Sequence, residues 1–322
     1  PEFNSQFLED NQRIPFQLNN LSVVNGEGNV DIKGESRPEA EEVDLKVTTD
    51  QLAIGELARL VTSPVDILAG TLALDAEVNL SLDGNLPTFQ GTANLNNVTA
   101  KVEQLSQPFT NTNAAIRLAE QDIIFEDFKT KLGDVSAIAQ GKINLKTGYD
   151  LNAEIQPTAI ANLLTAADLE ASEIPISGKV KANIAITGGL ENPQFDITAE
   201  STESTKIDQI NLQRFQSKVS VNGNNLTLEK FQATPQTGGE ISAQGKVNLT
   251  EAQTVALDVQ LKDISGEMIR PYQPDLPSEL GILNASGKIT GSFKDWKNLE
   301  VDGTANLDIA EGSVSIPKLN LS

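Results

Sequence analysis

Apolar and polar residues alternate along the stretch of chain that begins at Gly178. From Val180 to Ile186 apolar side chains occupy every second position, and Lys181 and Asn183 lie between them. A period of two is typical of a β-strand that has one apolar and one polar face. The stretch therefore predicts a strand, and similar alternation recurs along most of the chain.

This strand pattern returns at a nearly constant separation. Similar strands begin at Gly70 and Gly287, which lie 108 residues before and 109 residues after Gly178. The recurrence predicts a repeat protein, in which residues 1–322 form one continuous repetitive β-segment. We expect a partial unit at residues 4–69, complete units at 70–177 and 178–286, and a partial unit at 287–322.

Short helical patches interrupt the alternation. Apolar residues three and four apart predict a helix over residues 50–61, with Thr49 or Asp50 as its N-cap. Residues 158–167 and 264–269 occupy the same place in the following units. The tight turns elsewhere indicate antiparallel pairing, so the sequence predicts an all-β fold with a few short helices. In residues 123–128 apolar side chains occupy both odd and even positions, so the pattern does not assign the two faces of that strand.

Composition and charge narrow the class of protein. Hydrophobic residues make up 39% of the 322 residues but aromatic residues only 4%, which fits a thin continuous apolar layer better than a thick core. Lys and Arg number 24 against 45 Asp and Glu, for a net charge of −21. This excess argues against nucleic acid as a partner and against electrostatic docking on anionic lipid.

The residues needed for most enzyme chemistry are missing. The chain has no Cys and no His, so it has no thiol, no disulfide and no imidazole base. It carries no phosphate-binding loop and no nucleophile elbow, and its carboxylates are scattered at polar strand positions such as Asp75 and Glu77. We therefore expect no enzyme activity, no cofactor and no metal. No apolar run approaches the roughly 18 residues that a membrane helix needs.

The two ends indicate an excised segment. Residues 1–3 resemble a cloning scar, and the chain stops inside a strand pattern at Ser322. We therefore expect an interior piece of a longer protein, whose targeting and anchoring segments this sequence does not carry.

The apolar face has two interpretations. It could belong to a closed core, in which facing strands cover each other, or to an open trough that receives acyl chains. Both alternate with a period of two, so the pattern alone leaves them open. The face continues across unit boundaries and consists mainly of aliphatic side chains, which favours the trough.

Three features resemble the TamB family of AsmA-like proteins. They are the strand start at Gly178, the Gly-containing turn that leads to Pro-x-Phe over residues 186–195 and again near 82–89, and the Gly-Lys-Val/Ile-Asn-Leu strands at 245–249 and 141–145. The resemblance extends over nearly the whole chain. It implies an elongated repeat β-sheet curled into a U-shaped "β-taco" with an apolar interior.

The resemblance also implies a function and a place. Family members are anchored in the inner membrane of diderm bacteria, cross the periplasm and meet a TamA-type outer-membrane barrel, and a relative lies in the chloroplast envelope. We expect a periplasmic or intermembrane segment of a bridge-like lipid-transfer protein, whose groove carries phospholipid acyl chains between the inner and outer membranes. The barrel would be contacted by parts of the longer protein that are absent from this chain.

The alternation also gives the residues expected to line the groove: Leu74, Val78, Leu82, Ala139, Ile143, Ile184, Ile186, Ala243, Val247, Val259 and Leu307. An alternative is a structural bridge or chaperone in outer-membrane protein assembly or protein translocation, which would hold extended polypeptide. A third class, a surface adhesin with a closed core, would bind no ligand in the face at all.

Overall fold

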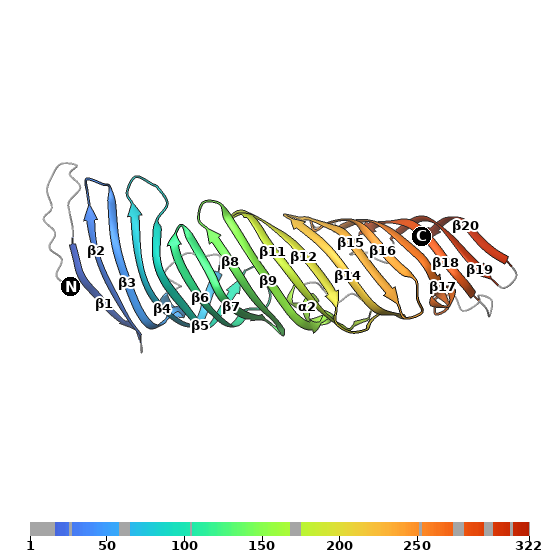
Figure 1. Cartoon of the computed structure of the whole chain (residues 1–322), viewed down its shortest axis with the longest axis horizontal. Coiled ribbons are helices and arrows are strands. Elements are labelled where there is room, and N and C mark those ends of the chain that lie inside the picture. Colours follow the sequence, from blue (N-terminus) through green and yellow to red (C-terminus); the bar gives the residue numbers. More distant parts are fainter. Residues whose placement is uncertain are drawn as a thin grey trace. The chain divides into compact units, whose positions relative to one another are not determined.

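A computed structural model describes residues 17–25, 28–57, 65–103, 105–167, 175–250, 253–272, 280–292, 299–309 and 312–321. The expected cloning scar at 1–3 and the end of the first expected helix, residues 58–61, lie outside the described residues. The fold is all-β, with 78% of residues in strands, little helix, and one large antiparallel sheet that is not closed (Figure 1). This confirms the expected all-β class with a few short helices.

The chain groups into two compact units. The first unit comprises residues 1–153 with the short pieces 166–168 and 187–191. From β1 to β8 each strand pairs with the next in antiparallel register. Its strands are β1 Gln17–Asn25, β2 Gly28–Arg37, β3 Glu42–Ala53, β4 Val65–Ser81, β5 Thr88–Val102, β6 Phe109–Glu120, β7 Asp122–Leu132, β8 Val135–Asn144 and the first half of β9 Gly148–Ala159.

The second unit comprises residues 154–165, 169–186 and 192–322. Its strands pair in chain order from β14 to β20, while β14 also pairs with β12 and β13, and β13 pairs with β10. Its strands are β10 Ile176–Ser177, most of β11 Lys179–Gly189, β12 Asn192–Ser201, β13 Thr205–Ile207, β14 Ile210–Asn222, β15 Asn225–Pro235, β16 Glu240–Asn248, β17 Thr254–Ser265, β18 Leu280–Ser292, β19 Glu300–Ile309 and β20 Gly312–Leu321.

In the described part of the chain, three short helices recur at equal intervals. The helix α1 spans Ile54–Leu57, α2 spans Ile160–Ala166, and the 3₁₀ helix η2 spans Gly266–Ile269. Their first residues are therefore 106 positions apart each time. Helices were expected at all three places, and all three are confirmed.

The first helix is shorter than expected and begins later. Residues 49–53 belong to β3, so the expected N-cap at Thr49 or Asp50 is wrong. The register of β3 on β4 shifts between Thr49 and Leu52, and Gln51 has a φ of 52°. This β-bulge adds residues between apolar positions, which imitates the spacing of a helix in the sequence.

A second bulge resolves the faces of residues 123–128. The register of β7 on β8 shifts between Phe125 and Phe128, so that Ile123, Phe125 and Phe128 all pair with Gly or apolar residues. Ile124 instead pairs with Arg117 and Lys142 on the other face. The alternation is thus regular on both sides of the bulge and changes phase across it.

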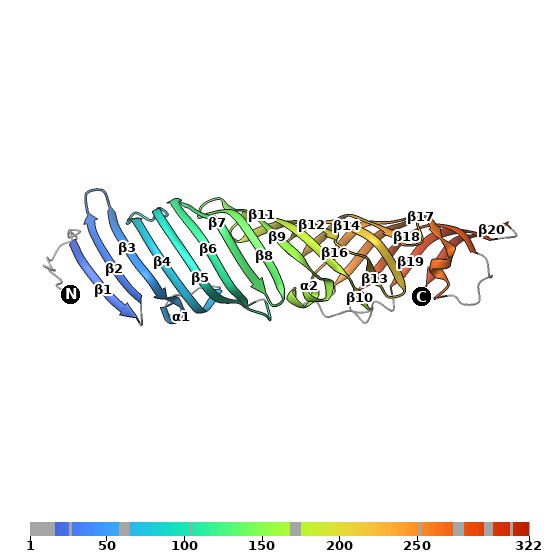
Figure 2. The ribbon, with the colours of Figure 1, turned by 60° about the horizontal axis from the view of Figure 1, so that its bottom comes forward.

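Each of two helices covers a buried cluster at one end of its own set of strands. In the first unit Leu52, Ile54 of α1 and Val98 form such a cluster, and α1 lies against β4 (Figure 2). In the second unit Ile264 and Leu283 form the equivalent cluster with Leu307, and Met268 and Ile269 of η2 pack on it. Leu52 and Ile264 both directly follow a bulge.

One hydrogen bond between side chains is buried in the first unit. Thr112 of β6 and Thr130 of β7 are 6% and 7% exposed, and their hydroxyl oxygens are 2.7 Å apart. Each hydroxyl therefore depends on the other for a partner away from water.

Thr130→Val should lower the free energy of unfolding by about 1–3 kcal/mol, because it leaves the Thr112 hydroxyl buried without its partner. The double variant Thr112→Val/Thr130→Val should be close to the wild type, since both polar groups are then gone. Urea titrations of the three proteins measure this. A double variant that is as unstable as the sum of the two single variants would contradict the account.

Candidate functional site

The register places apolar residues of the first unit in rows that cross the strands. Cross-strand partners in an antiparallel sheet share a face. One row passes through successive partners from β3 to β8: Val47, Ala76, Gly91, Leu118, Ile123 and Ile143. A neighbouring row contains Leu52, Leu72, Leu95, Ala114, Phe128 and Ala139. We call the side that carries these rows the apolar face.

The second unit has apolar rows of the same kind. One row runs from β15 to β19 through Leu228, Gly245, Leu257, Ile289 and Val301. The next row contains Phe231, Ala243, Val259, Gly287 and Gly303, and a third contains Ala233, Ile241, Leu261, Ala285 and Ala305. Each unit therefore has its own apolar face, continuous over β3 to β8 in the first unit and over β15 to β19 in the second.

Most large side chains on the two apolar faces are only half-buried. Away from the clusters under the helices, the most buried members of the first unit's face are Ala and Val residues, for example Ala76 at 2%, Val135 at 4% and Ala93 at 7% exposed. Leu74, Ile116 and Phe125 beside them are half-buried. The middle of the face therefore leaves aliphatic surface accessible in the described part of the chain.

The first unit also contains a groove of about 990 Å³ across β1 to β6. Its lining takes residues of both parities: Leu45, Val78 and Phe89 belong to the apolar face, whereas Lys46 and Glu77 belong to the opposite face. Val78 is the expected lining residue that it includes.

The structure places the expected lining residues as follows. Leu74, Val78, Ala139 and Ile143 lie on the apolar face of the first unit, and Ala243, Val247 and Val259 lie on that of the second, where Ala243 and Val259 are register partners. Val247 and Leu307 are each 8% exposed, and Leu307 belongs to the cluster under η2. Ile184 and Ile186 are half-buried in β11, at the same parity as the buried Val180 and Ala182. Leu82 lies beyond the end of β4 and is 49% exposed.

Aromatic residues of the face were not among the expected lining residues. Phe125 and Phe128 pack edge to face in the first unit, with ring centroids 5.7 Å apart. Phe215 and Phe231 stack in the second unit at 5.9 Å. Phe125, Phe128 and Phe231 flank bulges, where simple alternation assigns them to no face. The sequence signal that could have indicated these bulges is a pair of apolar residues three positions apart, such as Phe125 and Phe128.

Glycines at the centres of the rows bring neighbouring backbones close together. Gly141 and Gly245 have φ values of 123° and 155°, and an added Cβ would lie 2.2 Å from the Asp150 carbonyl oxygen or 2.1 Å from that of Ala256. Only glycine fits such positions. Glycine kinks and bulges of this kind bend a sheet.

The opposite face carries the charge. In the first unit Lys46 lies 3.3 Å from Glu77, and Lys142 lies 2.9 Å from Asp122. In the second unit Lys218 lies 2.6 Å from Glu229. These side chains are substantially exposed, so each pair contributes little stability. These charged side chains keep the polar face hydrated, so the two faces of each unit differ in chemistry.

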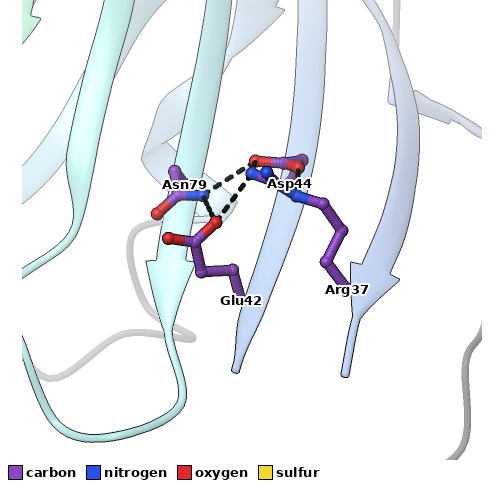
Figure 3. A network of polar contacts seen from close by, with 4 residues as sticks. All are labelled: Arg37, Glu42, Asp44 and Asn79. Carbon is purple, nitrogen blue, oxygen red and sulfur yellow. Dashed lines mark hydrogen bonds and ion pairs between the residues drawn. The ribbon is translucent and has the colours of Figure 1, made fainter. Parts of the chain in front are cut away.

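A four-residue network connects β2, β3 and β4 on the polar face (Figure 3). Arg37 Nε and Nη2 lie 2.6 and 2.8 Å from the two oxygens of Asp44, and Nη2 is also 2.8 Å from Glu42. Asn79 donates to Asp44 at 2.8 Å and to Glu42 at 3.2 Å. The hydrogen bond from Arg37, with a further one from Asn79, holds the pKa of Asp44 below its usual value.

Two kinds of site are not seen among the described residues. Their acidic side chains form no group of three or more that could hold a metal ion. None of the helices within those residues is long and apolar enough to cross a membrane.

Comparisons of the chain with protein-family models, curated proteins and solved structures gave no significant match.

Gly245→Ala should destabilise the second unit by about 1–3 kcal/mol, since the new methyl group meets a backbone oxygen and φ is unfavourable for alanine. Gly189→Ala is the matched control, because nothing lies within 4 Å of its added Cβ. Thermal and urea unfolding of both variants provide the measurement. Equal stability of the two variants would show that the kink is not required.

The Arg37–Asp44 contact should make stability depend on acid pH. The pKa of Asp44 is lowered in the folded protein, so the stabilisation is present above the unfolded pKa of about 3.9 and is lost as pH falls through the folded value. Asp44→Asn should therefore be less stable than the wild type at pH 7. Between about pH 5 and pH 2 its free energy of unfolding should fall less than that of the wild type. Asp150→Asn in β9 serves as a control of equal charge. Identical pH profiles for Asp44→Asn and the wild type would contradict this assignment.

Proposed function

We propose that the apolar faces bind phospholipid acyl chains and that this chain is a segment of a bridge-like lipid-transfer protein of the TamB type. One observation carries the proposal: each unit presents in-register apolar rows, continuous across its strands, whose large aliphatic side chains stay half-exposed. A core that only stabilises the fold would bury those side chains.

The chemistry of the rows suits an acyl chain. Removing apolar surface from water contributes about 25 cal/mol per Å², or about 0.8 kcal/mol for each buried CH₂ group. The surface consists of Val, Ile, Leu, Ala and Phe and offers no charged group to bind a tail at one point. Neighbouring strands are about 4.8 Å apart, so an acyl tail can move from strand to strand between sites of similar affinity.

Bulges and glycines that can curve a sheet support a trough as the proposed form of this surface. Bulges recur in β3, β7, β15 and β17, and glycines at φ values above 120° interrupt β5, β8, β16 and β18. Both devices curve a sheet. In the proposed U-shaped arrangement the tails lie along the apolar floor and the headgroups stay in water at the open side.

The place and partners of the proposal rest on the family resemblance. It assigns the segment to the periplasm or an equivalent intermembrane space, in a longer protein that is anchored in the inner membrane. A TamA-type outer-membrane barrel would meet other parts of that protein. Phospholipid is the partner that the apolar rows of this chain support directly.

Extended polypeptide is the second candidate occupant, and the open sheet favours it. The described strands leave the sheet unclosed, and a polypeptide can add a strand at a free edge. A photo-crosslinking amino acid at Val259 distinguishes the two, because phospholipid adducts support lipid carriage whereas peptide adducts support the chaperone or translocation role.

Val259→Asp should reduce the phospholipid that co-purifies with the protein several-fold, because it places a carboxylate in an apolar row against the tails. Gln260→Asp is the matched control, since this neighbouring side chain of β17 is exposed and lies at the opposite parity. Phosphate analysis after solvent extraction measures the lipid, and circular dichroism checks the fold. Unchanged lipid content in a folded Val259→Asp protein, or equal losses in both variants, would overturn the proposal.

A further inference from the structure

The two ends of the strands differ in each unit. Neighbouring antiparallel strands run in opposite directions, so successive connections alternate between the two ends. The helix α1 lies between β3 and β4, and η2 lies between β17 and β18. We call the strand ends next to these helices the helix side. We call the opposite ends the leucine side, because the connections that follow β4, β8 and β16 begin there with Leu82, Leu145 and Leu249.

The helix side of each apolar face is covered. The buried members of the clusters under α1 and η2 are at most 8% exposed. In the second unit the residues after η2 extend this cover, since Gln209 donates its backbone N–H to the Tyr272 hydroxyl at 3.4 Å. Gln209 lies between β13 and β14, so residues 266–272 follow the helix side from β17 to β14. Along these stretches the apolar face is shielded from water.

The three residues that name the leucine side share one backbone arrangement. The N–H of each leucine donates to the carbonyl oxygen of the residue directly before the neighbouring strand, at 2.7–3.0 Å. The acceptors are Glu41, Gln121 and Asn224. Each leucine also lies two positions beyond a residue of the apolar face, namely Leu80, Ile143 or Val247. The leucines therefore continue the apolar parity past the ends of their strands.

Polar side chains hold the turns that these leucines begin. Asp83, Asn144 and Asn248 each accept a hydrogen bond from the backbone N–H two positions later, at 3.1, 2.9 and 3.0 Å. Such a bond fixes a turn through the Asp or Asn side chain. The turns do not need the leucine side chains, and turn residues are usually polar or glycine. The apolar character of the leucines therefore points to a role outside the turns.

The leucine side is also where the apolar faces meet water. Leu82 and Leu249 are 49% and 43% exposed, and Leu145 is half-buried. Leu80 and Leu86, which are near Leu82 in the chain, are 36% and 42% exposed. Each unit therefore has an accessible aliphatic edge on this side, in contrast to its covered helix side.

We propose that acyl chains reach the apolar face of each unit sideways, across the leucine side, and that Leu82 and Leu249 are side chains over which they pass. This inference rests on the proposed function, because it concerns the route by which a lipid tail reaches the surface proposed to bind it. A tail that crosses the strand ends must pass polar turn groups, which offer it no favourable contact. The leucines supply aliphatic surface at that step, while the headgroup stays beside the polar turns.

The double variant Leu82→Asn/Leu249→Asn tests this route, since asparagine is close to leucine in size but polar. The probe is a phosphatidylcholine vesicle that carries a trace of pyrene-tailed phosphatidylcholine, whose excimer fluorescence falls as labelled lipid moves to the protein. Uptake by the full chain should be about three- to ten-fold slower in the variant. The lipid bound when uptake is complete should fall much less, because the rest of each apolar face is intact.

Leu68→Asn/Ile282→Asn is the matched control. Leu68 and Ile282 are 48% and 44% exposed, lie near the helix-side ends of β4 and β18, and belong to neither cluster under the helices. This control should take up lipid at the wild-type rate. Equal slowing in both double variants, or wild-type rates in both, would overturn the route alone. A wild-type chain that takes up no lipid would overturn the proposed function as well.

A block added after folding tests the route without a polar substitution. The chain has no Cys, so Leu82→Cys/Leu249→Cys and Leu68→Cys/Ile282→Cys carry only the introduced thiols. Coupling of a maleimide-linked polyethylene glycol to the first variant should slow uptake at least as much as the asparagine substitutions do. The same polymer on the second variant should leave the rate unchanged. Uptake that is insensitive to the polymer on the leucine side, or equally sensitive to it on both sides, would contradict the assigned route.

Discussion

The antiparallel register is the constraint on which the rest of this structure depends. Side chains alternate between faces along every strand, so a slip of one residue between two strands would turn one strand's apolar set to the polar side. The observed pairings keep Ala76 beside Gly91 in the first unit and Val259 beside Ala243 in the second. Because each pairing preserves the face, separate amphipathic strands become one extended apolar surface in each unit.

Bulges and glycines keep this register while they bend the strands. A bulge consumes extra residues and returns the chain to the correct face, as between Thr49 and Leu52 and between Phe125 and Phe128. Gly141 and Gly245 allow the adjoining backbone to approach more closely than any Cβ would permit. Such devices allow strands to bend while the apolar parity of the face is kept.

The sequence predicted the fold class well, because a period of two is a local property of each strand. It predicted the apolar parity of β4, β8, β16 and β17, which contain Val78, Ile143, Ala243 and Val259. It failed where the period breaks. Of the helix expected over residues 50–61, the part up to Ala53 belongs to a strand, because a bulge imitates helical spacing in the sequence.

Burial was also beyond the reach of the pattern. Val247 and Leu307 have the same alternation as Val259, yet they are 8% exposed, and Leu307 lies under a helix that is distant in sequence. Phe125 and Phe128 lie on the apolar face through a bulge that no alternation rule locates. Alternation therefore gives the face of a residue, whereas its accessibility depends on tertiary contacts.

The central claim is that acyl chains lie on one face of the sheet, and methyl NMR with a phospholipid that carries a nitroxide on its tail tests it most directly. In a protein labelled at Ala, Leu and Val methyl groups, signals of Leu257, Val259 and Leu261 in β17 should broaden strongly. Ala256, whose register partners are Lys246 and Thr290 on the polar face, should be spared. Equal broadening of Ala256 and Leu257, or no broadening of either, would contradict the account.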